Sequence, residues 1–294
     1  MDRNTQSRIV TRQEAFRWGA RAMTQAGVPE PARDATVLMG HVTGEDPCLV
    51  LLDRDLFLGR EEALRFKGLV GRRCFREPLS QLLGAREFRS LEFKVSRDVL
   101  TPRPETETLL DLAEEYLNDL GSPALIADVG TGPGTIAVSL AVSVPSCRVV
   151  GVDISQEALR IAVFNARRHG VGKRVRFARM DLTSGLKQDA RFDLVVSNPP
   201  YIRDDEYGSL PPEVRNGDPR CALVAGPEGT EFYRPVAMGA GNLLKPDGVL
   251  MVEVGKDMEG KVARIMKECG FGSIEITPDL AGINRVVTGK PVHG

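Results

Sequence analysis

Four residues in the middle of the chain have the types and the spacing to hold a planar amino group. They read Asn198, Pro199, Pro200 and Tyr201. They follow an apolar, partly β-branched run, 192–196, that predicts a buried strand. Because proline cannot donate a hydrogen bond to a sheet, the strand must end near Asn198 and give way to a stiff loop. In open α/β sheets, ligands bind at this carboxyl end of the strands.

The atoms of this loop match a primary amide or an exocyclic amino group. Asn198 has an amide oxygen, Pro199 a carbonyl without an N–H of its own, and Tyr201 a flat ring. Two acceptors that bind both N–H groups direct the nitrogen lone pair at an electrophile and stabilise the positive charge that develops there. No general base is then needed before transfer. The alternative is a purely structural Pro-Pro turn after a buried strand, in which these atoms would have no chemical role.

A second motif, at residues 128–135, predicts a cofactor site. It reads Asp128, Val129, Gly130, Thr131, Gly132, Pro133, Gly134 and Thr135, between a predicted strand and a predicted helix. The glycines allow a tight turn and let the backbone approach a ligand in front of the helix N-terminus. Their G-x-G-x-G spacing differs from the G-x-G-x-x-G of the nicotinamide and flavin fingerprint. Asp128 suits the amino end of S-adenosylmethionine better than a pyrophosphate, which its negative charge would repel.

Acidic residues at the ends of the next two predicted strands extend this site. Asp153 ends the strand 148–154, where an acid accepts hydrogen bonds from the ribose of NAD or of S-adenosylmethionine alike. Asp181 and Leu182 follow the strand 175–180 and can bracket an adenine. Each acid alone is as easily a helix cap or a loop residue. Three acids at successive strand ends of one sheet favour a nucleoside-containing cofactor.

The composition is that of an ordinary globular protein. The 294 residues are 42% hydrophobic and 27% charged, with a net charge of −1. This charge and 5% aromatic residues give no electrostatic footprint for nucleic acid or an anionic membrane. Five cysteines without a C-x-x-C pair and three histidines predict neither disulfides nor a metal site. Without a signal-peptide pattern or a long apolar run, we expect a cytoplasmic protein.

Helical spacing of apolar residues predicts an all-α domain over residues 1–78. The capping-box pattern of Thr11 and Glu14 begins the first helix, and Trp18 falls on its predicted buried face. Pro78 ends the domain. The predicted helices cover residues 12–26, 31–43, 48–52 and 61–75.

Residues 79–100 predict a β-hairpin linker, because apolar and polar residues alternate there. The rigid, charged segment 101–107 follows, and it opens an amphipathic helix that reaches Leu120. Its position before the glycine motif predicts that it closes over the ligand. Residues 203–230, rich in Asp, Glu, Pro and Gly, have no periodicity and predict a substrate flap.

Strands and helices alternate over the rest of the third predicted domain, 101–294, which is typical of a doubly wound, mostly parallel sheet. The predicted strands cover 125–129, 148–154, 175–180, 192–197, 249–254, 274–277 and 286–288. The predicted helices between them cover 135–142, 156–169, 231–244 and 259–268.

On these motifs the sequence resembles the class I S-adenosylmethionine-dependent methyltransferases, and more narrowly the PrmC/HemK family of protein-glutamine methyltransferases, which modify peptide-chain release factors. The resemblance covers nearly the whole chain. The Pro-Arg-Pro-Glu-Thr-Glu element at 102–107 and the N-terminal helical domain separate this family from methyltransferases of DNA adenine and RNA guanine. Other matching segments are 76–79, 84–88, 99–101, 128–134, Asp153, 198–201 and 282–287.

The resemblance implies an α/β fold with a doubly wound, seven-stranded, mostly parallel methyltransferase sheet, preceded by a small all-α helical bundle and a β-hairpin linker. Leu182 departs from the family, where an aromatic residue is frequent, and this bears on how tightly the adenine is held. Thr101 and Met258 are smaller departures. The expected cofactor residues are Asp128, Gly130, Thr131, Gly132, Pro133, Gly134, Asp153, Asp181, Leu182 and Asn198. The expected substrate residues are Asn198, Pro199, Pro200 and Tyr201, with catalysis by Asn198, Pro199 and Tyr201.

The activity that follows is transfer of a methyl group from S-adenosylmethionine to the glutamine side chain in the Gly-Gly-Gln loop of a release factor. Three alternatives stay open. A sister family methylates a glutamine of a ribosomal protein with the same loop. Enzymes with this loop also methylate adenine or guanine in nucleic acid, which would favour a basic groove and aromatic platforms. The third alternative is a binding module that has lost its activity.

Overall fold

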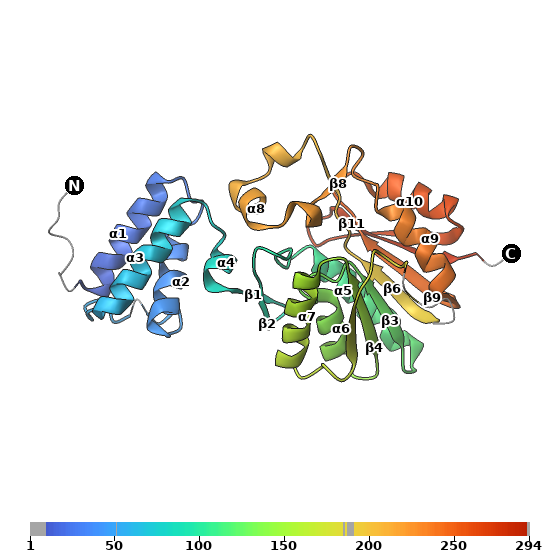
Figure 1. The fold of residues 1–294 in the computed structure, drawn as a ribbon, viewed down its shortest axis with the longest axis horizontal. Helices are drawn as coiled ribbons and strands as arrows, with labels where there is room; N and C mark the ends of the chain where they lie inside the picture. Colours follow the sequence, from blue (N-terminus) through green and yellow to red (C-terminus); the bar gives the residue numbers. More distant parts are fainter. Residues whose placement is uncertain (1–9, 51, 185, 187–190, 293–294) are drawn as a thin grey trace. The chain divides into compact units, whose positions relative to one another are not determined.

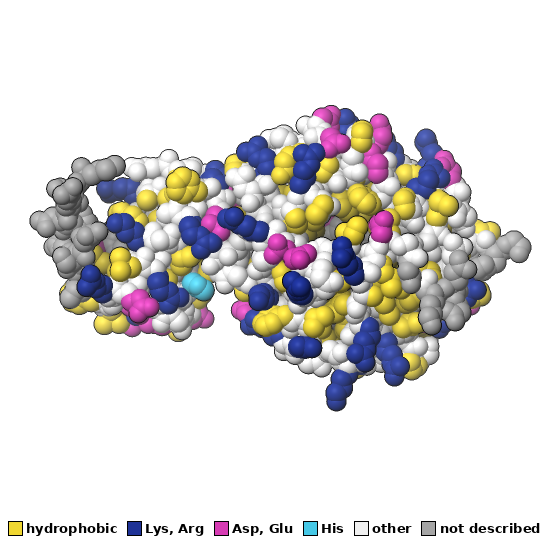
Figure 2. Space-filling view, viewed as in Figure 1, with side chains coloured by type: hydrophobic (Ala, Val, Ile, Leu, Met, Phe, Trp, Pro, Cys, Tyr) yellow, Lys and Arg dark blue, Asp and Glu magenta, His cyan; other side chains and the backbone are white. Residues whose placement is uncertain are grey.

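A computed structural model describes residues 10–50, 52–184, 186 and 191–292, and Figure 1 traces their fold. These residues form two compact units. One comprises the described residues up to Gly84 together with Pro211–Gly217, and the other comprises Ala85–Leu210 and the residues from Asp218 onward. We call them the helical unit and the sheet unit. On the face seen in Figure 2, Lys and Arg side chains lie among Asp and Glu side chains, in keeping with a net charge of −1.

The helical unit packs its helices around a small apolar core. The predicted capping box is confirmed, since Thr11 Oγ1 accepts from the Glu14 backbone N–H at 3.2 Å and Glu14 Oε2 accepts from the Thr11 N–H at 2.9 Å. Met23, Leu38 and Phe66 are fully or almost fully buried in the core. The helices are α1 (Arg12–Gln25), α2 (Pro31–Thr43), α3 (Arg60–Cys74) and α4 (Leu79–Leu83).

Two predictions for this unit are wrong. Trp18 is 45% exposed, because the buried face of α1 centres on Gly19, where an added Cβ would lie 3.0 Å from the Phe66 ring. The helix predicted at 48–52 is also wrong, since the described residues there form turns. The Asp46 side chain accepts from the Cys48 N–H at 2.7 Å, and such local side-chain bonds compete with a helix.

The segment Pro211–Gly217, remote in sequence, belongs to the helical unit and contains α8 (Pro212–Gly217). The Glu213 carboxylate accepts from Arg76 Nε at 2.6 Å and from Arg73 at 3.0 Å. Arg73 also donates to Asp34 at 2.7 Å, and the side chains of this second pair are almost fully buried. Removal of either carboxylate would leave a buried guanidinium without its full charge compensation, which costs free energy. These ion pairs therefore hold the segment against α2 and α3.

The sheet unit confirms the predicted seven-stranded sheet, whose order is β10-β11-β9-β6-β3-β4-β5. In this sheet β11 is antiparallel to both of its neighbours, β10 and β9, and all other neighbouring strands pair in parallel. A hairpin of β1 (Ala85–Phe88) and β2 (Leu91–Lys94) precedes it. The strands are β3 (Leu125–Val129), β4 (Arg148–Asp153), β5 (Val175–Arg179), β6 (Phe192–Ser197), β9 (Leu244–Glu253), β10 (Phe271–Pro278) and β11 (Asn284–Pro291).

Helices cover both faces of the sheet (Figure 1), as its apolar strands require. One core lies between the sheet and α5 (Thr106–Leu120), α6 (Thr135–Ser143) and α7 (Gln156–Arg168), and the other between the sheet and α9 (Tyr233–Leu243) and α10 (Glu259–Glu268). In the register of the strands, Val129 lies beside Val152 on one side and Ser197 on the other. The carboxyl ends of β4, β3 and β6 therefore meet at one edge, where the sequence places its motifs.

The segment 203–230 is more regular than its sequence predicts. Within it, β8 (Val224–Gly226) pairs in parallel with β7 (Ile202–Arg203), which directly follows the Asn-Pro-Pro-Tyr loop. The short helices η1 (Tyr207–Ser209), α8 and η2 (Arg220–Ala222) lie between these two strands. The segment is thus tied by main-chain hydrogen bonds to the end of the loop, and none of these short elements has a periodicity long enough to be predicted.

Candidate active site

The glycine-rich turn between β3 and α6 adopts a backbone that only glycine accepts readily. Gly130, Gly132 and Gly134 have φ of +76°, +55° and +83°. An added Cβ at Gly130 or Gly132 would meet no described heavy atom within 4 Å, whereas one at Gly134 would lie 3.2 Å from Ala162. The first two glycines therefore border open space at the strand ends, and the third is needed for packing against α7.

Asp128, at the end of β3, is fully buried beneath this turn. Its Oδ2 accepts from Thr131 Oγ1 at 2.6 Å and from the Ala137 backbone N–H at 3.1 Å. Its Oδ1 is buried and accepts no hydrogen bond from the described residues. Burial raises the pKa of this carboxyl to about 7, against the lowering effect of those two donors. Asp128 thus holds the turn with one oxygen and keeps the other free for a cationic or N–H group.

Asp153 ends β4 on the other side of the turn. Its Oδ2 accepts from the Gly132 N–H at 2.9 Å and its Oδ1 from the Ser155 N–H at 2.8 Å. Since a carboxylate oxygen has two acceptor sites, each oxygen can still accept a hydroxyl. The carboxylate is partly exposed at the rim, a position that suits the ribose of a nucleoside.

Asp181 and Leu182 follow β5, as predicted. Asp181 is exposed, and Leu182 is half-buried against the core under α9 and α10. Leu182 has a φ of +49°, in the left-handed region that a branched side chain seldom adopts. No pattern in the sequence predicts this conformation.

The Asn-Pro-Pro-Tyr loop leaves the end of β6, whose six residues are all buried. Ser197 Oγ donates to the Val129 carbonyl at 2.7 Å, so the loop begins directly beside the glycine turn. Asn198 is half-buried, and its Nδ2 donates to Thr106 Oγ1 at 3.1 Å. Pro199 is buried, and Pro200 and Tyr201 are half-buried. The sheet unit therefore brings both predicted motifs to the same edge.

The side chain of Tyr201 packs on a glycine. An added Cβ at Gly255 would lie 2.9 Å from the Tyr201 ring, so only glycine lets the ring take this position. Burial, followed by the negative charge of Glu253, raises the pKa of Tyr201 to about 12. The phenol therefore stays neutral at physiological pH and is no general base.

The site contains residues that the sequence did not reveal. Thr106 Oγ1 donates to Glu253 Oε2 at 2.7 Å, and both side chains are buried. Thr106 lies in the predicted segment 101–107, whereas Glu253 ends β9. The only sequence signal for Glu253 is a charged residue inside the apolar run of a predicted buried strand.

Asp218, from the middle of the predicted flap 203–230, holds the segment 101–107. Its Oδ1 accepts from the Thr101 N–H at 3.0 Å and from Thr101 Oγ1 at 2.9 Å, and its Oδ2 forms an ion pair with Arg103. Asp218 is 6% exposed, and its burial outweighs Arg103 and raises its pKa. The segment 101–107 is thus anchored at one end by Asp218 and contacts Asn198 through Thr106.

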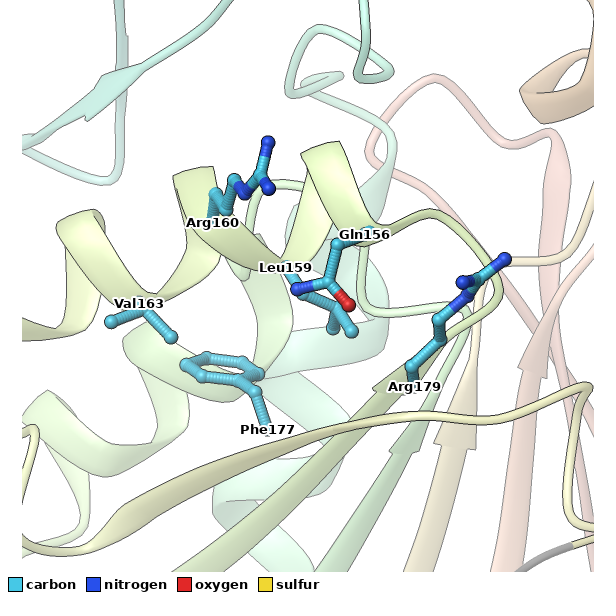
Figure 3. A pocket seen from close by; sticks show the side chains of 6 residues that line it. All are labelled: Gln156, Leu159, Arg160, Val163, Phe177 and Arg179. Atoms are coloured by element: carbon cyan, nitrogen blue, oxygen red, sulfur yellow. The ribbon is translucent and has the colours of Figure 1, made fainter.

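A cavity of about 360 Å³ opens between α7 and β5, beside the cofactor motif (Figure 3). None of the predicted site residues lines it. The Phe177 ring in its wall also lies against the backbone of Gly151, where an added Cβ would be 2.7 Å away. The lining residues are Gln156, Leu159, Arg160 and Val163 from α7, and Phe177 and Arg179 from β5.

Comparisons with known proteins agree with this fold. A family model described as a methyltransferase domain matches residues 123–280, and one described as the PrmC N-terminal domain matches residues 14–84. A methyltransferase structure from Pyrococcus furiosus has the same fold, with a TM-score of 0.53 and 16% identity over 76% of this chain and 99% of that one. The fold and the site define an S-adenosylmethionine-dependent methyltransferase.

Two relatives show which family of methyltransferases the chain belongs to. The chain is 37% identical over 279 residues to the release factor glutamine methyltransferase of Cereibacter sphaeroides, with 94% of this chain and 97% of that protein covered. It is 39% identical over 282 residues to the release factor glutamine methyltransferase of Geobacter sulfurreducens, with 96% and 97% covered. The chain belongs to the family of release factor glutamine methyltransferases.

Two general features of the described part of the chain concern membranes and metals. No helix there is long and apolar enough to cross a membrane. No group of three or more His, Cys, Asp or Glu side chains there has an arrangement that would hold a metal ion.

Proposed function

We propose that this protein methylates the side-chain amide nitrogen of the glutamine in the Gly-Gly-Gln loop of a peptide-chain release factor. The observation that carries the proposal is the placement of Asn198 and Pro199 beside the glycine turn, in a chain of this family. A release factor works in translation, so the proposed compartment is the cytoplasm. No direct contact with nucleic acid, metal or membrane is part of the proposal.

The fit of the site supports the cofactor residues that we assign. The open space at Gly130 and Gly132 lets backbone approach a ligand, and the free Oδ1 of Asp128 suits the amino end of S-adenosylmethionine. We assign the ribose to Asp153 and the adenine to the Asp181-Leu182 step. Thr131, Pro133 and Gly134 complete the turn, and Asn198 borders the methyl donor. When bound, S-adenosylmethionine supplies an electrophilic methyl group.

The substrate residues act by orientation. Asn198 Oδ1 and the Pro199 carbonyl accept the two N–H bonds of the glutamine amide, and Tyr201 and Pro200 flank its plane. The acceptors hold the nitrogen lone pair in line with the electrophile and stabilise the positive charge that develops on nitrogen. A proton leaves to solvent after transfer, so no residue has to act as a base beforehand.

The division of labour along the chain is part of the proposal. We assign recognition of the protein substrate to residues 1–78, a linking role to residues 79–100, and cofactor binding and catalysis to residues 101–294. The sheet unit already contains every residue that the transfer needs, and a glutamine on a protein loop requires additional contact surface of several hundred Å².

The direct test is incubation of the purified protein with candidate release factors and methyl-labelled S-adenosylmethionine, followed by mass mapping of peptides. The expected product is one methyl group on the glutamine of the Gly-Gly-Gln peptide. Label on a glutamine of a ribosomal protein, or on adenine or guanine in RNA or DNA, with the release factor unlabelled would refute the proposal.

A further inference from the structure

Three side chains from separate parts of the sheet unit form a hydrogen-bonded chain that ends on Asn198. Asn198 Nδ2 donates to Thr106 Oγ1 at 3.1 Å, and Thr106 Oγ1 donates to Glu253 Oε2 at 2.7 Å. Thr106 is 4% exposed and Glu253 is fully buried. Water therefore has no access to Glu253, and the protein alone determines the direction of each bond in the chain.

The direction of the chain follows from the number of protons. A threonine hydroxyl has one proton, and an ionised carboxylate can only accept, so Thr106 must give its proton to Glu253. The Thr106 oxygen then offers only lone pairs to Asn198. An acceptor on this side requires the Asn198 nitrogen to face Thr106, so the Asn198 oxygen must face the other way.

We propose that Glu253, acting through Thr106, is a positioning residue that fixes the Asn198 amide with its oxygen toward the substrate. The inference rests on the proposed function, because only transfer to an N–H group needs an acceptor at this place. An asparagine turned by 180° would present its NH₂ group to the glutamine NH₂ group, and two donors cannot bond. Glu253 itself touches neither substrate nor cofactor.

The surroundings of Glu253 support this role. Its second oxygen, Oε1, is buried and accepts no hydrogen bond from the described residues. Burial, with the nearby charge of Glu105, raises the pKa of Glu253 to about 7, whereas Thr106, Arg285 and Asn198 lower it. Tyr201 and Tyr233 also face it, and both stay neutral because their pKa values are raised.

Protonation of Glu253 would remove the constraint on the orientation of the Asn198 amide. A carboxylic acid donates to Thr106 Oγ1, the hydroxyl proton is then free to point at Asn198, and the amide oxygen can turn inward. The rate of transfer should therefore rise as the pH rises through about 7, when Glu253 ionises. Asp128 titrates in the same range, so the change in this dependence on replacement of Glu253 is the measurement that decides.

The test compares Thr106→Val with Thr106→Ser in single-turnover methyl transfer at saturating cofactor and release factor. Valine keeps the shape and removes the hydroxyl, and serine restores it. We expect Thr106→Val to lower the rate at least tenfold, with a smaller change in KM, and Thr106→Ser to stay within threefold of wild type. Thr108→Val, on the same helix and outside the hydrogen-bonded chain, should stay within twofold.

A Thr106→Val rate within twofold of wild type, or a serine variant as slow as the valine variant, would overturn the proposal. If Thr106→Val fails to melt cooperatively, Glu253→Gln replaces it. Its amide oxygen can still accept from Thr106 but it cannot ionise, so that variant should lose the rise in rate through pH 7 that wild type shows. An unchanged pH profile in Glu253→Gln would also overturn the proposal.

A second measurement separates this inference from the proposed function. NMR of protein labelled with ¹⁵N in its asparagine side chains should show slow solvent exchange of the Asn198 amide protons. The exchange should accelerate at least tenfold in Thr106→Val, and Asn198→Asp identifies the resonance by its loss. If wild type methylates no candidate partner, the proposed function fails while this comparison still decides the role of Thr106. Equal exchange rates would overturn it.

Discussion

Replacement of Glu253 by glutamine should stabilise the protein at high pH. The Glu253 carboxyl is fully buried, and burial raises its pKa from the ordinary value of 4.5 to about 7. The folded state therefore binds this proton more tightly than the unfolded state does. The stability that Glu253 contributes is fully present below about pH 4.5 and is lost as the pH rises through about 7. Glutamine has the same shape and no proton to lose.

The magnitude follows from the two pKa values. At about 1.4 kcal/mol for each of the 2.5 pH units between them, the free energy of unfolding that wild type loses by pH 8 is at most about 3.5 kcal/mol. The variant avoids this loss but exchanges the buried carboxyl group beside Thr106 for a carboxamide, at a cost of about 1 kcal/mol. We expect Glu253→Gln to be slightly less stable than wild type at pH 5 and about 1–2 kcal/mol more stable at pH 8.

Urea unfolding at pH 5, 6, 7 and 8 checks this prediction. Far-UV circular dichroism follows the whole chain, and fluorescence of Trp18, the single tryptophan, follows the helical unit as an internal reference. Glu157→Gln is the matched control, because it makes the same change of side chain at an exposed position. Asp128 titrates in the same range but is present in every variant. A stability difference between Glu253→Gln and wild type that stays constant from pH 5 to pH 8 would refute the reasoning.

Three further predictions address the proposed roles. Asn198→Ala should lower the single-turnover rate by about 10²–10³, as loss of one preorganised polar contact does. An unchanged rate would contradict the catalytic role of the Asn-Pro-Pro-Tyr loop. Asp153→Ala should weaken binding of S-adenosylmethionine in calorimetry by about 1.5–3 kcal/mol, with Glu157→Ala unchanged; binding of NAD instead would contradict the cofactor assignment. A chain that begins at Arg86 and carries Glu213→Gln, since the partners of Glu213 are removed with the helical unit, should bind cofactor nearly normally. Its kcat/KM on intact release factor should fall at least tenfold and on a Gly-Gly-Gln peptide much less; equal losses in a cooperatively melting chain would assign the helical unit a supporting role.

Local sequence patterns were sufficient to predict the strands and helices of the sheet unit, because these elements have strong periodicity and clear ends. The strands 125–129 and 192–197 and the helix 259–268 were predicted with the bounds that the structure gives. Each is an apolar run or an amphipathic pattern that ends at Gly, Pro or Asn. The helix predicted at 48–52 failed because it was short, and a single side-chain bond from Asp46 outweighed its weak preference.

The interactions around Asn198 could not be read from the sequence. Thr106 is 92 positions from Asn198 and 147 positions from Glu253, and no local pattern joins residues at such separations. The same holds for Asp218, which reaches Thr101 across 117 positions. Thr106 has the type of an ordinary residue in the first turn of a helix, and Glu253 alone departs from its context. A charge at the end of a buried strand was the one available signal.

An asparagine at position 198 requires another residue that fixes the orientation of its amide group. An aspartate would present an oxygen to the substrate in either orientation of its carboxylate, whereas an asparagine presents one in only one of its two orientations. The amide therefore needs a neighbour that distinguishes its nitrogen from its oxygen. A lone hydroxyl cannot do so, because it donates and accepts equally well. A hydroxyl whose proton is already committed to a buried carboxylate can, and Thr106 beside Glu253 is such a hydroxyl.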